Sequence, residues 1–146
     1  MRTQNKNKTK TYTHVMVGIL INSQDQICIS KRPDHKHLGG YWEFPGGKKN
    51  LGESNFEALK REFHEEVGVE IQDAEPWFEI MHDYADCKIL LDIWLIKNYQ
   101  GQPKSCEGQI VKMISLDQLG AYVFPEGNHE IVARLLERFN KDKNNF

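Results

Sequence analysis

The chain has 146 residues and a mass of 17.0 kDa, enough for one domain with a buried core. Charged residues make up 27% and the formal net charge is −2, so no overall basic field favours stable nucleic-acid binding. The sequence lacks an apolar run of membrane-spanning length and a signal-peptide apolar core, which predicts no membrane association. Three widely spaced cysteines form neither a disulfide framework nor a C-x-x-C metal pair, so we expect reduced thiols and a cytoplasmic protein.

Both ends of the chain differ in composition from the middle. Residues 1–11 are polar and basic, which predicts a flexible N-terminal arm. A solubilising tail is favoured over a nucleic-acid arm for so short a run. Residues 141–146 are expected to form a flexible tail. This leaves residues 12–140 as a single domain without internal repeats.

Within that domain, apolar and β-branched runs predict several strands. His14–Ile21 reads as a buried strand, residues 22–25 as a turn and Gln26–Lys31 as a second strand, which together predict a hairpin. Residues 33–40 are expected to form a loop. Further extended segments are predicted at Trp42–Phe44, Trp77–Tyr84, Lys88–Lys97 and Gln109–Ile114.

Two segments have helical periodicity. Phe56, Leu59, Phe63 and Val67 recur at helical spacing, and Gly68 then favours a helix end. A second helix is predicted from about Asn128 to Phe139, with one apolar side. Strands flanked by two helices predict an α/β sandwich with a mixed β-sheet.

The run GKKNLGESNFEALKREFHEEVGV, from Gly47 to Val69, carries the most information. In its helix, Glu62, Glu65 and Glu66 lie at i, i+3 and i+4, so their carboxylates share one face and repel each other. A hard divalent cation such as Mg²⁺ removes that repulsion, and it can bridge a pyrophosphate and acidify a water molecule. Arg61 cannot bind metal, so we expect it to orient a glutamate through a bidentate ion pair. Glu53 is expected in the first helical turn.

A solvated, glutamate-rich helix face is the alternative, stabilised by i, i+4 pairs such as Glu57 with Arg61. The spacing of the whole run argues against it. The pattern G-x5-E-x7-R-E-U-x-E-E-x-G-U, where U is a bulky apolar residue, is complete here. Its chance occurrence in such a chain has a probability on the order of 10⁻⁷.

This pattern resembles the signature box of the Nudix hydrolases, which cleave nucleoside diphosphates linked to another group. The resemblance implies an α/β/α sandwich with a mixed sheet and a divalent metal, Mg²⁺ with Mn²⁺ as a substitute. Outside the box, from Val15 to Phe139, the chain is similar to the MutT branch, which hydrolyses oxidised guanine nucleoside triphosphates. The segments that carry this similarity are VGILIN, ISKR, EFPGGK, CEGQ and FPEGN.

The resemblance assigns roles to individual residues. The metal site would comprise the Gly46 carbonyl and the carboxylates of Glu62, Glu65, Glu66 and Glu107. The nucleotide would lie near Arg32 and His37, with its base against Phe44 and read by Asn128. The chain departs from the MutT pattern at Leu90 and Asp92 and in the loop at 33–40, which leaves the substrate less certain than the chemistry.

Each of these residues also has a simpler interpretation. Phe44 could be a core aromatic, Arg32 a surface charge, and Asn128 a helix cap. The role of Asn128 has a physical basis, however. The 8-oxo form of guanine carries N7–H beside the O6 acceptor, and one Asn amide can accept from the first and donate to the second. Unmodified guanine would oppose two lone pairs, and a buried site built on such pairing rejects the wrong base strongly.

The sequence therefore predicts hydrolysis of 8-oxo-dGTP, and of 8-oxo-GTP, to the monophosphate and pyrophosphate by a monomeric enzyme. This reaction sanitises the nucleotide pool and prevents mutation. Glu53 or a metal-bound carboxylate would be the general base. One alternative is a Nudix pyrophosphohydrolase for an NTP, ADP-ribose or a dinucleoside polyphosphate, for which Tyr84 is weak support. Another is a Nudix-fold ligand sensor without turnover, which the complete glutamate set disfavours.

Overall fold

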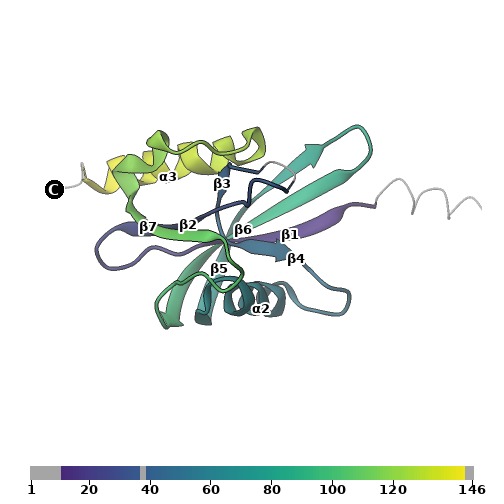
Figure 1. Cartoon of the computed structure of the whole chain (residues 1–146), viewed down its shortest axis with the longest axis horizontal. Coiled ribbons are helices and arrows are strands. Elements are labelled where there is room, and N and C mark those ends of the chain that lie inside the picture. Colours follow the sequence, from purple (N-terminus) through teal and green to yellow (C-terminus); the bar gives the residue numbers. More distant parts are fainter. Residues whose placement is uncertain (1–10, 37–38, 144–146) are drawn as a thin grey trace, which may run out of the picture.

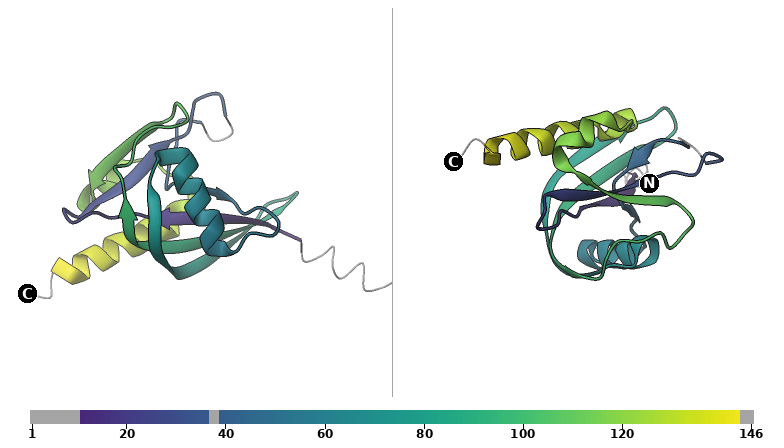
Figure 2. Two further views of the ribbon diagram at one scale, coloured as in Figure 1. Left: turned by 90° about the horizontal axis from the view of Figure 1, so that it is seen from below. Right: turned by 60° about the vertical axis from the view of Figure 1, so that its left-hand side comes forward.

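The computed structural model describes residues 11–36 and 39–143. Two helices, α2 (Asn55–Val67) and α3 (His129–Lys143), lie on opposite sides of the strands, as Figure 1 shows. The strands form two sheets, and the second view in Figure 2 shows both between the helices. The expected α/β/α sandwich is therefore confirmed.

The larger sheet has the order β4-β1-β6-β5. Its strands are β1 (Thr13–Ile19), β4 (Gly46–Lys48), β5 (Glu70–Asp83) and β6 (Lys88–Gln100). β1 and β6 are parallel, whereas the β4–β1 and β6–β5 pairs are antiparallel, so this sheet is mixed as predicted. The smaller sheet is antiparallel, with the order β3-β2-β7. It contains β2 (Gln26–Lys31), β3 (Trp42–Glu43) and β7 (Ile110–Ser115).

The turn of the predicted β1–β2 hairpin forms, but the predicted pairing of the two strands is wrong. The turn itself forms, because the Asn22 side chain accepts hydrogen bonds from the amides of Gln24 and Gln26. Pairing then stops after the Ile21–Ile27 bridge and one hydrogen bond from Cys28 to Leu20. The two strands diverge into different sheets, because β1 pairs with β4 and β6 while β2 pairs with β3 and β7.

Helix α2 begins at Asn55, later than the sequence suggested, which placed Glu53 in the first turn. Ser54 is its N-cap: the Ser54 hydroxyl accepts from the Glu57 amide at 3.1 Å, and the Glu57 carboxylate accepts from the Ser54 amide at 2.9 Å. Glu53 therefore lies before the helix, and not in its first turn as predicted. At the other end Gly68 adopts φ 70° and its amide donates to the carbonyl oxygens of His64 and Phe63, so the predicted glycine stop is confirmed.

Several boundaries differ because long-range pairing extends the strands. β5 and β6 are much longer than their apolar runs, since the two pair from Glu70–Gln100 to Asp83–Lys88 through several register shifts. Two short 3₁₀ helices precede α3, η1 (Leu116–Ala121) and η2 (Glu126–Asn128), and the sequence indicated neither. Helix α3 begins at His129 and reaches Lys143, beyond the predicted end of the domain.

Two apolar clusters hold the layers together. One packs α2 onto the larger sheet through Leu59, Phe63 and Val67, all fully buried. The other joins both sheets to α3 and includes Ile131 and Leu135 from that helix. No disulfide joins the three cysteines. Within the ranges given above, no helix is long and apolar enough to cross a membrane.

Candidate active site

A cleft of about 390 Å³ opens between the two sheets at the C-terminal end of α2. This volume lies within the range of pockets that bind small molecules. Six of the residues predicted to act together line the cleft: Arg32, Phe44, Gly46, Glu66, Glu107 and Asn128. They come from segments spread over almost a hundred residues of sequence. Arg61, Glu62 and Glu65 lie on α2 and Glu53 lies just before it, and none of the four lines the cleft. His37 lies outside the described residues.

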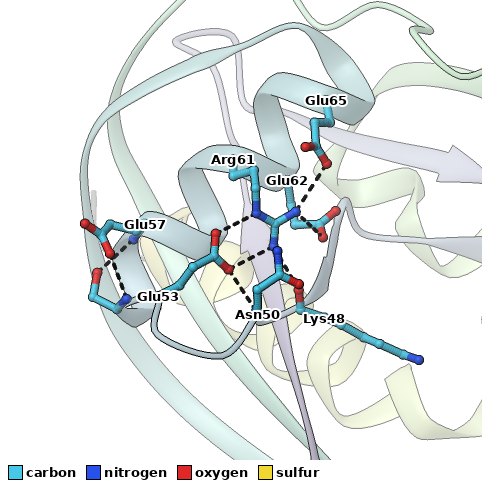
Figure 3. A network of polar contacts seen from close by, with 8 residues as sticks. Lys48, Asn50, Glu53, Glu57, Arg61, Glu62 and Glu65 are labelled. Carbon is cyan, nitrogen blue, oxygen red and sulfur yellow. Dashed lines mark hydrogen bonds and ion pairs between the residues drawn. The ribbon is translucent and has the colours of Figure 1, made fainter.

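Arg61 is the centre of an ion-pair network on α2, shown in Figure 3. Its guanidinium donates to both carboxylate oxygens of Glu53, at 2.6 and 3.0 Å, and to Glu62 at 3.0 Å. It also reaches Glu65 at 3.2 Å and the Lys48 carbonyl at 3.0 Å. The bidentate pair is therefore with Glu53, and the alternative pairing of Arg61 with Glu57 is not formed, because Glu57 belongs to the capping box.

These donors change the acidity of Glu53. Hydrogen bonds from Arg61, and then from the Asn50 amide at 2.8 Å, lower the pKa of Glu53 from 4.5 to about 2. A carboxylate with such a low pKa is a weak base at neutral pH. The geometry gives Glu53 the means to fix Arg61, and through it the glutamates that Arg61 contacts.

Glu62 and Glu66 form the acidic pair of the site. Burial, followed by the charge of Glu62, raises the pKa of Glu66 to about 9. Burial also raises the pKa of Glu62, although Arg61 opposes this rise. The Gly46 amide donates to Glu66 at 3.3 Å. The two carboxyl groups therefore retain a proton at neutral pH unless a cation takes its place.

Close packing of β4 against α2 holds the acidic pair in position. A Cβ atom at Gly47 would lie 2.4 Å from the carboxylate carbon of Glu62. Any side chain at position 47 would displace Glu62. The glycine of the box at this position is thus explained by the approach of the strand backbone to a charged side chain.

A divalent cation fits the chemistry of this pair, although the donors do not form a closed cage. Among residues 11–36 and 39–143, no three His, Cys, Asp or Glu side chains converge as metal ligands. Glu65 is 50% exposed and contacts Arg61, and Glu107 is exposed on a loop. Glu62, Glu66 and the Gly46 peptide would be supplemented by Glu107, water and phosphate oxygens, a set that Mg²⁺ favours.

The opposite end of the cleft is aromatic. Phe44 is buried and stacks on Phe124, with ring centroids 5.0 Å apart and an interplanar angle of 20°. It belongs to the core cluster, as one interpretation of Phe44 predicted, and it also lines the cleft. Asn128 is the last residue of η2, immediately before α3. In the described part of the chain its side chain makes no hydrogen bond to α3, which leaves the amide available in the cleft.

Several polar residues of the cleft were missed by sequence reasoning, among them Glu43, Lys36 and Gln109. Glu43 is half-buried and pairs with Arg32 at 3.2 Å, so Arg32 is more than a surface charge. Burial raises the pKa of Glu43, and Arg32 partly offsets this rise. Lys36 and Gln109 also line the cleft. The only signal for Glu43 was its place directly before Phe44, in the segment EFPGGK.

The departures from the MutT pattern in β6 lie off the cleft. Leu91 lines it, whereas Leu90 and Asp92 do not. Asp92 is buried and accepts hydrogen bonds from His14 and Trp94, both at 2.9 Å. Tyr84 is 47% exposed, stacks on His82 and does not line the cleft, which weakens the dinucleoside polyphosphate alternative.

Sequence comparison gives the class of the protein. Residues 16–134 match the family model of the NUDIX domain, and the chain therefore belongs to the Nudix family. Nudix hydrolases generally need a divalent metal, in agreement with the acidic pair.

Within the family, the chain is similar to 8-oxo-dGTP diphosphatases. The enzyme of Escherichia coli K12 is 36% identical over 121 residues, which cover 83% of this chain and 94% of that protein. The Haemophilus influenzae enzyme is 33% identical and covers 87% and 93%. A solved structure from work on MutT of Aliivibrio salmonicida and Vibrio cholerae has a TM-score of 0.79 and 37% identity, over 88% of this chain and 99% of that one.

Proposed function

We propose that this chain is a Mg²⁺-dependent hydrolase of 8-oxo-dGTP, and of 8-oxo-GTP, that releases the monophosphate and pyrophosphate. One observation carries the proposal. A single cleft is lined by the acidic residues Glu66 and Glu107, and by Phe44 and the available amide of Asn128. Metal-assisted phosphate chemistry and recognition of an oxidised base thus meet in one cavity. The similarity to 8-oxo-dGTP diphosphatases over most of both chains supports the same conclusion.

The phosphate end prepares the anhydride for attack by water. When bound, Mg²⁺ polarises the phosphate and acidifies a water molecule. Glu62 and Glu66 would hold the ion, and the Gly46 carbonyl, Glu65 and Glu107 would complete the set of protein ligands. Arg61 holds Glu62 at 3.0 Å and is itself fixed by Glu53. Because the pKa of Glu53 is about 2, the general base is one of the other glutamates.

The base end supplies the discrimination. Phe44, fixed by its stacking on Phe124, offers an apolar face to a purine ring. The Asn128 amide accepts from N7–H of 8-oxoguanine and donates to O6. Arg32, held by Glu43, would contact the nucleotide, and Lys36 in the cleft offers a further cation for phosphate. The same role is proposed for His37 from the family resemblance alone, because His37 lies outside the described residues.

The deciding experiment compares kcat/KM with Mg²⁺ for 8-oxo-dGTP, dGTP and CTP, with pyrophosphate release as the readout. CTP is included because an E. coli CTP pyrophosphohydrolase is 29% identical, over 73% of this chain and 79% of that protein. A preference of several orders of magnitude for 8-oxo-dGTP is expected. Similar slow turnover of all three nucleotides would indicate that the enzyme acts on another Nudix substrate. Nucleotide binding without any pyrophosphate release would indicate a ligand sensor.

The same proposal includes the setting of the enzyme. It acts as a cytoplasmic monomer on a free nucleotide, without stable binding to nucleic acid. Residues 12–140 form the catalytic domain, and residues 1–11 and 141–146 are dispensable for turnover. Sedimentation of the full chain and the activity of a chain lacking residues 1–11 test these points directly. A stable dimer, or loss of turnover on truncation, would refute them.

A further inference from the structure

A loop with little regular structure carries Glu107 to the cleft. Residues 101–109 connect β6 to β7, and most of them are exposed. Glu107 itself is exposed. Ordering each residue of such a segment costs about 1–2 kcal/mol in backbone entropy. A metal ligand on this loop needs a tether, and the loop contacts reveal one.

The Gln109 side chain ties this loop to α2. Its amide oxygen accepts from the Ser105 hydroxyl and from the Glu107 backbone amide, both at 3.0 Å. Its amide nitrogen donates to the Glu66 carbonyl oxygen at 3.0 Å. One side chain thus connects the backbones of Glu66 and Glu107, two of the acidic residues that line the cleft.

The end of α2 offers a suitable anchor for this tether. The last carbonyl groups of a helix lack partners within the helix. The Glu66 carbonyl oxygen accepts hydrogen bonds from the Gln109 side-chain amide at 3.0 Å and from the Cys106 backbone amide at 3.1 Å. The Val67 carbonyl oxygen accepts one from the Lys104 backbone amide at 3.0 Å. The loop therefore caps α2. Among the described residues, Gln109 is the only one whose side chain forms hydrogen bonds both to this loop and to the end of α2.

We propose that Gln109 is the positioning residue that holds Glu107 beside Glu66 and thereby preorganises the metal site. This inference rests on the proposed function, in which Glu107 and Glu66 are metal ligands. Gln109 acts through Glu107 and contacts neither the metal nor the reacting atoms. The Glu107 and Glu66 partners are backbone groups, so this role depends on the amide at position 109, which the Ser105 hydroxyl further orients.

Gln109→Met tests the tether, because it keeps the length of the side chain and removes all three hydrogen bonds. In the metal-free full chain, we expect hydrogen exchange of the Glu107 amide to become at least about tenfold faster, since that amide loses its acceptor. The Lys104 amide, which bonds to Val67, is an internal reference and should not change. Gln102→Met, an exposed glutamine of the same loop, is the matched control. Unchanged exchange at Glu107 would overturn the proposal.

Mn²⁺ binding, measured by calorimetry without nucleotide, tests the consequence. Loss of a residue that orients a metal ligand typically costs about 10–100-fold in metal affinity. We expect about tenfold weaker binding in Gln109→Met, a smaller loss in Ser105→Ala, and none in Gln102→Met. Native affinity in Gln109→Met would overturn the proposal. Thermal unfolding of each variant verifies that the fold is intact, and Ser105→Ala provides the test if Gln109→Met fails to fold.

A double-mutant cycle separates this inference from the proposed function. Glu107→Gln alone tests the metal-ligand role, and native Mn²⁺ affinity in that variant would refute the ligand role and this inference together. If Glu107→Gln weakens binding, adding Gln109→Met should cause no further loss, because Gln109 acts through Glu107. An equal further loss would show that Gln109 acts elsewhere and would overturn the inference alone.

Discussion

The two ends of the cleft are built differently. At the end proposed to bind the phosphates, charged side chains fix one another: Arg61 contacts three glutamates, and Glu66 is held by the Gly46 amide. At the base end, Phe44 is fixed by stacking on Phe124, while the Asn128 amide has no partner on α3 among the described residues. The phosphate end is therefore preorganised by electrostatics and the base end by packing. Mutations at the first should act on chemistry and metal binding, and mutations at the second on substrate choice.

The largest effect is expected from Glu66→Gln. Removing the half-buried carboxylate should lower kcat for 8-oxo-dGTP by about 10²–10⁴-fold while the fold is retained. Glu137→Gln, an exposed glutamate on α3, is the matched control. Steady-state kinetics and circular dichroism provide the measurements. A Glu66→Gln variant with native kcat would break the assignment of chemistry to this end.

Asn128→Ala should affect the base end alone. The variant loses two hydrogen bonds to the oxidised base, so kcat/KM for 8-oxo-dGTP should fall by about 10²-fold or more. Turnover of dGTP should remain within a few-fold of the native value, which would reduce discrimination by the same factor. Asn98→Ala, at an exposed position of β6, is the control. Equal losses with both nucleotides would mean that Asn128 has only a structural role.

Arg61→Lys should produce a smaller loss at the phosphate end. Lysine keeps the positive charge but cannot form the planar, bidentate contact with Glu53. We expect kcat to fall by about tenfold at saturating Mg²⁺, with little change in the preference for 8-oxo-dGTP over dGTP. A change in that preference would contradict the division of the cleft into two independent ends.

The smallest effect is on the pH dependence of stability. The pKa of Glu66 is raised to about 9 in the fold, against about 4.5 when unfolded. As pH rises between these values, the unfolded state releases the proton before the folded state does, so the metal-free protein loses stability. The full shift would amount to about 1.4 kcal/mol per pH unit. Solvent screening at the half-buried Glu66 reduces the expected gain of Glu66→Gln between pH 6 and 8.5 to roughly 1–2 kcal/mol over the native chain. Urea unfolding in EDTA measures this gain.

Mg²⁺ provides the matching control for that measurement. The ion replaces the shared proton of Glu62 and Glu66, so it should stabilise the native chain more at pH 8.5 than at pH 6. The same addition should have little effect on Glu66→Gln. The raised pKa of Glu66 would be contradicted if the difference in metal-free stability between the native chain and Glu66→Gln were the same at pH 6 and pH 8.5.

Much of the phosphate end could be predicted from the sequence because its spacing is local. The three glutamates and Arg61 lie within six residues of one helix, so their mutual placement follows from helical geometry alone. The end of the helix at Gly68 follows in the same way. Even here the cap was misjudged, because the Ser54–Glu57 capping box competes with Glu53 for the helix start.

The base end could be predicted only through resemblance to a family. Arg32, Phe44 and Asn128 have no spacing that predicts their meeting, and residues such as Glu43 and Gln109 were not recognised as part of the site. Long-range sheet pairing brings them together, and the same pairing separates β1 from β2. Which strands pair depends on how the whole chain is buried, so a short stretch of sequence does not determine it.

The sequence by itself thus determined the helix, its acidic face and the class of chemistry, because interactions within a few residues fix a helix. Tertiary structure decided that Arg61 pairs with Glu53, that Glu62 and Glu66 are buried enough to retain a proton, and that Gln109 joins Glu107 to α2. The physical reason is that burial, and contacts between distant segments, exist only once the two sheets and both helices have packed.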